Sequence, residues 1–151
     1  MRKIVSNIVA TVALTAACPV WAEGYLCVSE MSAGFSMDKS TRAWSATTFR
    51  TDVKYIIARA TPSEKVKMPK SVWTVKRLGD NFPVAACGSD FNDAGYLNCE
   101  GFEQFQFNRK NNRFLSAYLI GYLTDDPNDT TGLFKEGANT PSLSGGRCSP
   151  I

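Results

Sequence analysis

Residues 105–118, Phe-Gln-Phe-Asn-Arg-Lys-Asn-Asn-Arg-Phe-Leu-Ser-Ala-Tyr, decide the fold class, because an asparagine-rich polar insert separates two apolar runs. Asparagine tolerates left-handed backbone angles and can hydrogen-bond its own turn, so residues 108–113 are predicted to form a β-hairpin loop. The returning apolar run reaches residue 123 and is apolar on both faces of a strand, which predicts a central strand buried on both sides. A short helix near 114–123 is the alternative, because periodicity alone does not type a brief apolar run.

Other segments of the chain have the same β-type composition. Residues 25–31, 53–58 and 71–77 are rich in β-branched and aromatic side chains and are bounded by turn residues. We therefore expect an all-β domain, a small antiparallel barrel or sandwich of about seven to eight strands. An α+β domain with one short helix is the alternative fold.

The N-terminus has the layout of an export signal. Arg2 and Lys3 precede an apolar stretch, and small residues then lead to Ala22, so cleavage is expected before Glu23. This predicts a signal peptide at residues 1–22, a single β domain at residues 23–151, and a periplasmic or secreted protein. A permanent membrane span is the first alternative, but polar residues and a proline interrupt the run. Lipidation at Cys18 is the second alternative.

Removal of the signal would leave four cysteines, Cys27, Cys87, Cys99 and Cys148. An even set in an exported protein indicates disulfides, and three pairings are possible. We favour Cys87 with Cys99, which would close a turn-rich loop, and Cys27 with Cys148, which would join the two ends of the mature chain. The four residues lack the close pairs typical of structural zinc sites, so no metal or other cofactor is expected.

Several kinds of chemistry lack support in the sequence. The chain has no histidine, which is the commonest general base and a frequent zinc ligand. Ser36 and Lys39 match a penicillin-recognising pattern that the rest of this short chain does not continue. Two carboxylate pairs, Asp90 with Asp93 and Glu100 with Glu103, would need a shaped cleft to act as acid and base. The acidic residues at 125–129 depart from a calcium-binding loop in its glycine and its closing glutamate.

The charge of the chain gives little reason to expect a polyanionic partner. Loss of Arg2 and Lys3 with the signal lowers the formal charge from +3 to +1. We therefore expect neither nucleic acid nor an anionic membrane as partner.

The C-terminal residues Thr-Pro-Ser-Leu-Ser-Gly-Gly-Arg-Cys-Ser-Pro-Ile, 140–151, resemble the ending of small uncharacterised exported proteins of Gram-negative bacteria. Tyr25, Cys27 and Trp44 fit the same pattern, and so do the pairs at 107–108, 113–114 and 121–122. The resemblance implies a bacterial protein with a periplasmic or secreted location, and it implies no activity.

Two functional hypotheses follow. The first is a non-enzymatic protein that binds a protein partner in the cell envelope, as an inhibitor or an envelope-associated module. The alternative is a small barrel that carries an apolar ligand. Its expected ligand-binding residues are the aromatic side chains Trp44, Trp73, Phe105, Phe107, Tyr118 and Tyr122.

Overall fold

A computed structural model describes residues 24–38, 40–123 and 140–151. The predicted signal peptide at 1–22, the lipidation alternative at Cys18 and the acidic residues at 125–129 lie outside these ranges. Two helices and nine strands make up the secondary structure of the described residues: β1 (Gly24–Met37), β2 (Trp44–Thr48), β3 (Lys54–Arg59), α1 (Pro62–Lys67), β4 (Trp73–Arg77), β5 (Ala85–Cys87), β6 (Tyr96–Gly101), β7 (Gln104–Asn108), β8 (Arg113–Tyr118), α2 (Ile120–Leu123) and β9 (Ser142–Pro150).

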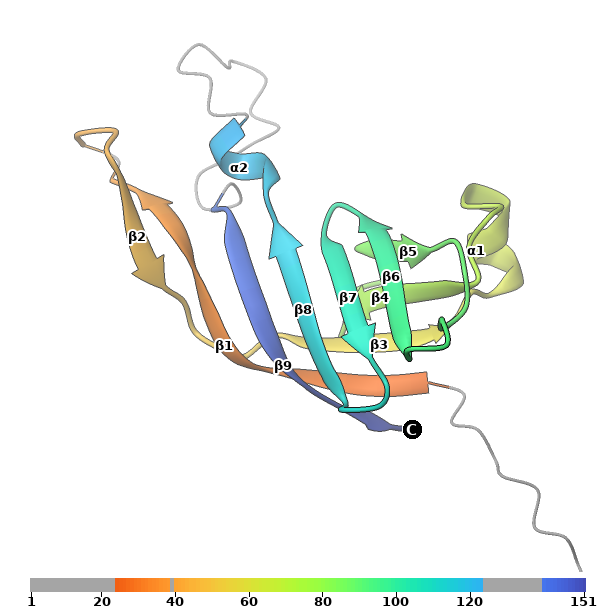
Figure 1. Cartoon of the computed structure of the whole chain (residues 1–151). Coiled ribbons are helices and arrows are strands. Elements are labelled where there is room, and N and C mark those ends of the chain that lie inside the picture. The colour runs from red at the N-terminus through yellow and green to blue at the C-terminus, as the bar shows by residue number, and fades with distance from the viewer. Residues whose placement is uncertain (1–23, 39, 124–139) are drawn as a thin grey trace, which may run out of the picture.

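The strands form one antiparallel sheet that closes on itself. Sequential neighbours pair from β3 to β9, and β1 pairs with both β3 and β9, which gives an eight-stranded barrel. The long strand β1 crosses the barrel and continues beyond β3, where its second half pairs with β2 (Figure 1). A bulge between Ser29 and Met31 marks the irregularity in its pairing with β9. The prediction of an all-β antiparallel barrel or sandwich of about seven to eight strands is confirmed, and the structure is a barrel of eight strands with β2 as one extra strand.

The predicted hairpin is present as β7 and β8. Residues 109–112 connect the two strands, and Asn112 has a left-handed backbone angle, with φ of 56°. The expectation of a strand buried on both sides is wrong: Phe114 is 3% exposed, whereas Leu115 is 51% exposed. A closed barrel buries only its inner face, so alternate residues of β8 point to solvent. The apolar run then divides, because β8 ends at Tyr118 and the single turn α2 begins at Ile120.

Close-packed apolar side chains occupy the interior of the barrel. Several residues of this core have no exposed surface, including Ile57, Val75, Leu97, Phe105 and Phe107. They come from alternate positions of β3, β4, β6 and β7, as expected for inward-facing residues of paired strands. Phe105 stacks on Phe114 with ring centroids 5.1 Å apart.

Both expected disulfides are present. Cys27 and Cys148 lie directly opposite each other on β1 and β9, so their disulfide crosses the seam at which the barrel closes. The disulfide between Cys87 and Cys99 joins β5 to β6 at the base of the loop 88–95. The favoured pairing is therefore confirmed.

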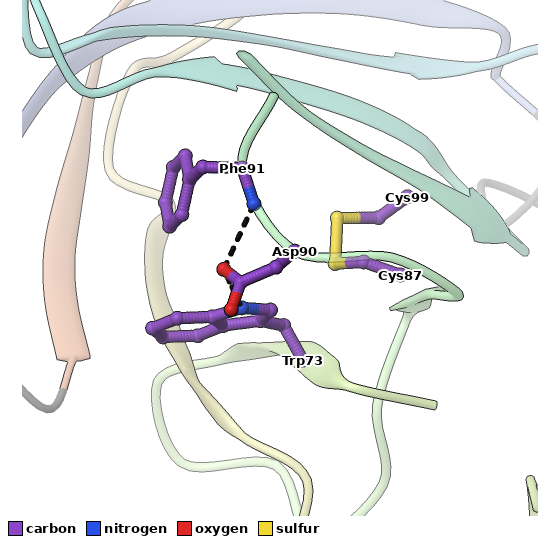
Figure 2. Close-up of a disulfide and its surroundings, with 5 residues drawn as sticks. All are labelled: Trp73, Cys87, Asp90, Phe91 and Cys99. Atoms are coloured by element: carbon purple, nitrogen blue, oxygen red, sulfur yellow. Dashed lines mark hydrogen bonds between the residues drawn. A yellow bond between two sulfur atoms is a disulfide. The ribbon is translucent and has the colours of Figure 1, made fainter. Parts of the chain in front are cut away.

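The loop 88–95 seals one end of the barrel, which we call the closed end. Its Phe91 ring packs against Trp73 and Phe107, with centroids 5.4 and 5.8 Å apart. Asp90 accepts hydrogen bonds from Trp73 Nε1 at 3.0 Å and from the Phe91 backbone N–H at 2.8 Å. Figure 2 places Asp90 over the indole of Trp73, with the Cys87–Cys99 disulfide beside the loop. The disulfide and the aromatic contacts thus hold the loop over the core.

Helix α1 is stabilised by its own ends and by one ion pair. Thr61 and Glu64 form a capping box, in which each side chain accepts a hydrogen bond from the other residue's backbone N–H. Glu64 also pairs with Lys76 of β4 at 2.6 Å. No helix among the described residues has both the length and the apolar character needed to cross a membrane.

The two disulfides should differ in their contribution to stability. We expect Cys27→Ser/Cys148→Ser to lower the free energy of unfolding by about 4.7 kcal/mol or more, and Cys87→Ser/Cys99→Ser by about 3 kcal/mol. The reason is loop length, since the paired residues are 121 and 12 positions apart in the sequence. Urea denaturation of the two variants and the unaltered protein measures both losses. Equal losses would contradict the chain-entropy argument.

Candidate functional site

The end of the barrel opposite the loop 88–95 carries polar side chains, and we call it the mouth. Strands β4, β6 and β8 finish there, and β3, β5, β7 and β9 begin there. A cavity of about 220 Å³ opens at this end. Its lining includes Ser32, Arg50, Tyr55, Arg77, Glu103 and Tyr118. We call it the mouth cavity.

A buried carboxylate organises the mouth cavity. The Glu103 side chain is 2% exposed, and three neighbouring side chains donate hydrogen bonds to it. Arg77 Nε donates to Oε1 at 2.9 Å and Arg77 Nη2 donates to the same oxygen, while Tyr55 Oη donates to Oε2 at 2.9 Å. Ser116 Oγ also donates to Oε2. Burial of a charge is costly unless it is paired and hydrogen-bonded, and Glu103 meets both conditions.

Register and alternation bring these four residues together. Tyr55 and Arg77 are direct partners on β3 and β4, and both face inward. Glu103 immediately precedes β7, and its backbone N–H donates to the Val84 carbonyl at 3.1 Å. Ser116 is opposite Phe105 on β8 and shares its inward face. The network therefore ties β3, β4 and β8 to the segment between β6 and β7.

The environment shifts the protonation equilibria of two groups in the network. Burial, together with the nearby charge of Glu103, raises the pKa of Tyr55 to about 12. Burial by itself would lower the pKa of Arg77, but the charge and hydrogen bonds of Glu103 raise it overall. Arg77 is therefore a fixed cation at the wall of the cavity, and its side chain remains 47% exposed.

Three exposed apolar side chains belong to residues that are next in the sequence to lining residues of this cavity. Leu78, Phe102 and Leu119 are 54%, 72% and 51% exposed. Each is the sequence neighbour of a cavity-lining residue, since they adjoin Arg77, Glu103 and Tyr118 respectively. We call these three side chains the apolar rim. A polar pocket within an apolar rim can hold a hydrogen-bonding group while its carrier packs against the rim.

The six aromatic residues expected to bind a ligand occupy three different places. Trp73, Phe105 and Phe107 belong to the buried core. Tyr118 lines the mouth cavity. Trp44 and Tyr122 pack on each other away from the core, with ring centroids 5.2 Å apart. The structure therefore does not bring the six together into one site.

From its sequence position, Glu103 is a candidate only as the partner of Glu100 in an acid–base pair. Glu100 is exposed, whereas Glu103 is buried and bound by three side chains, so the two do not face one another across a cleft. The sequence does indicate the burial of Glu103, because residues 103, 105 and 107 are alternate positions of one extended segment and therefore lie on the same face as the buried Phe105 and Phe107. Its partners lie on distant strands and gave no such signal.

The mouth cavity is rich in hydrogen-bond donors. Its donors are the Arg77 and Arg50 guanidinium groups and several hydroxyls, including those of Ser32, Ser144 and Tyr118. Among the residues that the structure describes, no group of three or more histidine, cysteine or acidic side chains could hold a metal ion. Comparison of the chain with protein-family models, curated proteins and solved structures finds no match in any of the three.

The buried hydroxyl of Tyr55 should make stability depend on pH in alkaline solution. Its pKa of about 12 in the folded protein lies above the ordinary value of 10, so its contribution is complete below pH 10 and is lost as pH rises through 12. We expect this loss to be about 2 kcal/mol after screening by solvent is allowed for. Urea denaturation of the unaltered protein and of Tyr55→Phe at several pH values gives the difference in their free energies of unfolding, which isolates the contribution of the Tyr55 hydroxyl. A stability difference that stays constant between pH 10 and 12 would contradict the assignment.

Proposed function

We propose that this protein is an exported, non-enzymatic binding module whose mouth docks a protein partner that inserts an acidic side chain. The observation that carries the proposal is the polar mouth cavity together with the exposed apolar rim residues Leu78, Phe102 and Leu119, each of which is next in the sequence to a residue that lines the cavity. Protein interfaces commonly bury apolar contacts around a few polar groups that are fully desolvated on binding.

The size and charge of the mouth cavity define the group it would accept. Its volume of about 220 Å³ is below that of a drug-sized ligand site and suits a single inserted side chain. Its charged lining residues are Arg50, Arg77 and Glu103, so the lining has a formal net charge of +1. An arginine held in place by a carboxylate has its geometry fixed before the partner arrives, which favours recognition of a carboxylate.

The state of Glu103 supports binding in preference to catalysis. Three donors hold its two carboxylate oxygens, so it has little freedom to take a proton from a substrate. Histidine is absent from the whole sequence. These features support a non-enzymatic role.

The two disulfides are consistent with a protein outside the cytoplasm. We propose a periplasmic or secreted location on this basis and on the N-terminal sequence pattern.

The alternative of an apolar-ligand carrier receives less support from the geometry. Trp73, Phe105 and Phe107 were expected to line its cavity, but they are at most 4% exposed and pack within the core. The mouth cavity has serine, arginine and glutamate side chains in its wall. An apolar molecule there would leave these groups without water, at a cost in free energy.

The proposal is tested by capturing partners from a cell-envelope fraction with the immobilised protein. The unaltered protein is compared with Phe102→Ser and Arg50→Gln, which alter the apolar rim and the charge of the cavity at exposed positions. We expect each variant to weaken the capture of the same partner, Phe102→Ser by about tenfold or more, because side chains central to an interface contribute most to affinity.

Ile151→Ser is the matched control. Ile151 is also a large exposed apolar residue, 62% exposed, but it lies beside Gly24 at the closed end. We expect this variant to capture the partner as the unaltered protein does. A partner whose binding responds equally to Ile151→Ser and Phe102→Ser, or to neither, would contradict docking at the mouth.

A further inference from the structure

Two arginines lie directly opposite each other on the outer face of the barrel. Arg113 of β8 and Arg147 of β9 are register partners, and both are exposed. Side chains in such a pair have Cβ atoms about 5 Å apart, and like charges in this arrangement are destabilising. The position therefore concentrates positive charge at a cost to the fold.

Nearby carboxylates offset only part of this charge. Arg147 Nε lies 3.4 Å from Glu30 Oε1, in a pair whose side chains are 67% and 47% exposed. In residues 24–38, 40–123 and 140–151, the ion pairs include none to Arg113. Counting Glu30 with the two arginines, this part of the surface keeps one net positive charge.

An apolar floor adjoins the arginine pair. The next outward-facing row across the strands consists of Leu115, Gly145 and Met31, which are successive register partners on β8, β9 and β1. Leu115 and Met31 are 51% and 64% exposed. A Cβ atom on Gly145 would lie 3.1 Å from Leu115 Cδ2 and 3.6 Å from Met31 Cγ, so glycine leaves the space between these side chains open.

The two rows together form a groove of about 470 Å³, which Tyr96 also lines. This volume falls within the range of small-molecule sites, roughly 300 to 1,000 Å³, and such sites usually combine apolar walls with a few polar groups. We propose that this outer groove binds a small organic anion with an apolar body. Its carboxylate would lie against Arg113 and Arg147, and its body would cover Leu115, Gly145 and Met31.

The arrangement of the strands favours a small molecule over an extended peptide. A peptide that adds to a sheet needs an unpaired strand edge for its backbone hydrogen bonds. Strands β8 and β9 each pair on both sides, so the groove offers side chains alone. A carboxylate needs only such side-chain donors, and guanidinium groups bind it in a bidentate manner.

A bound anion would also account for the arginine pair. Natural sequences tend to avoid local conflicts, and those that persist concentrate at functional sites. A carboxylate placed between Arg113 and Arg147 turns their repulsion into a shared attraction. The proximity of the two arginines would then both destabilise the protein without the anion and give the protein its affinity for the anion.

Calorimetric titration with three probes tests the inference. Octanoate has the carboxylate and the apolar body, octanol lacks the charge, and acetate lacks the body. We expect octanoate to bind at one site. Octanol and acetate should each bind at least about tenfold more weakly, because octanol cannot pair with the arginines and acetate cannot cover the apolar floor. Octanol binding as tightly as octanoate, or no binding of octanoate at all, would overturn the proposal.

Three variants place the site. We expect Arg113→Gln to weaken octanoate binding by about tenfold or more without lowering the melting temperature, because it removes a charge-assisted hydrogen bond and also relieves repulsion. Glu30→Gln should tighten binding, because it releases Arg147 from its ion pair. Lys65→Gln on α1 is the charge-matched control and should bind as the unaltered protein does. Equal effects of Arg113→Gln and Lys65→Gln, or weaker binding by Glu30→Gln, would assign the anion elsewhere.

Discussion

The pairing of β1 with β9 is the constraint on which the rest of the structure depends. It joins the first and last described strands, removes both edges from the eight-stranded barrel and creates an enclosed interior. The Cys27–Cys148 disulfide lies within this seam, so a covalent bond reinforces the same contact that the backbone hydrogen bonds make. The core, the mouth and the outer groove all require closure, because each uses side chains from strands far apart in the sequence.

Closure divides the interior into two chemically different parts. At the closed end, Phe91 packs against the aromatic core. At the mouth, Glu103 is buried in a setting that supplies its three hydrogen-bond donors. Removing one partner of such a network would leave a charge uncompensated, so the network ties the fold to one arrangement of β3, β4 and β8. The same rigidity holds Arg77 in place at the cavity wall.

The sequence was sufficient for features with a local cause. The asparagine-rich insert predicted the β7–β8 hairpin, and the turn-rich stretch between Cys87 and Cys99 predicted their disulfide, which left Cys27 and Cys148 as the second pair. Helix α1 was missed, although Thr61 and Glu64 have the spacing of a capping box. The burial of β8 was overestimated, since apolar composition does not reveal that one face of a barrel strand meets solvent. The Glu103 network depends on register across four segments, which composition and spacing do not encode.

The closed end also holds both ends of the described domain. The Ile151 backbone N–H donates to the Gly24 carbonyl at 3.0 Å, and Tyr25 is the register partner of Pro150. The C-terminus and the start of β1 lie together in Figure 1, away from α2 and the turn between β6 and β7. A tether attached at Gly24 or Ile151 would therefore hold the barrel by its base. The mouth would face away from whatever surface the tether was fixed to.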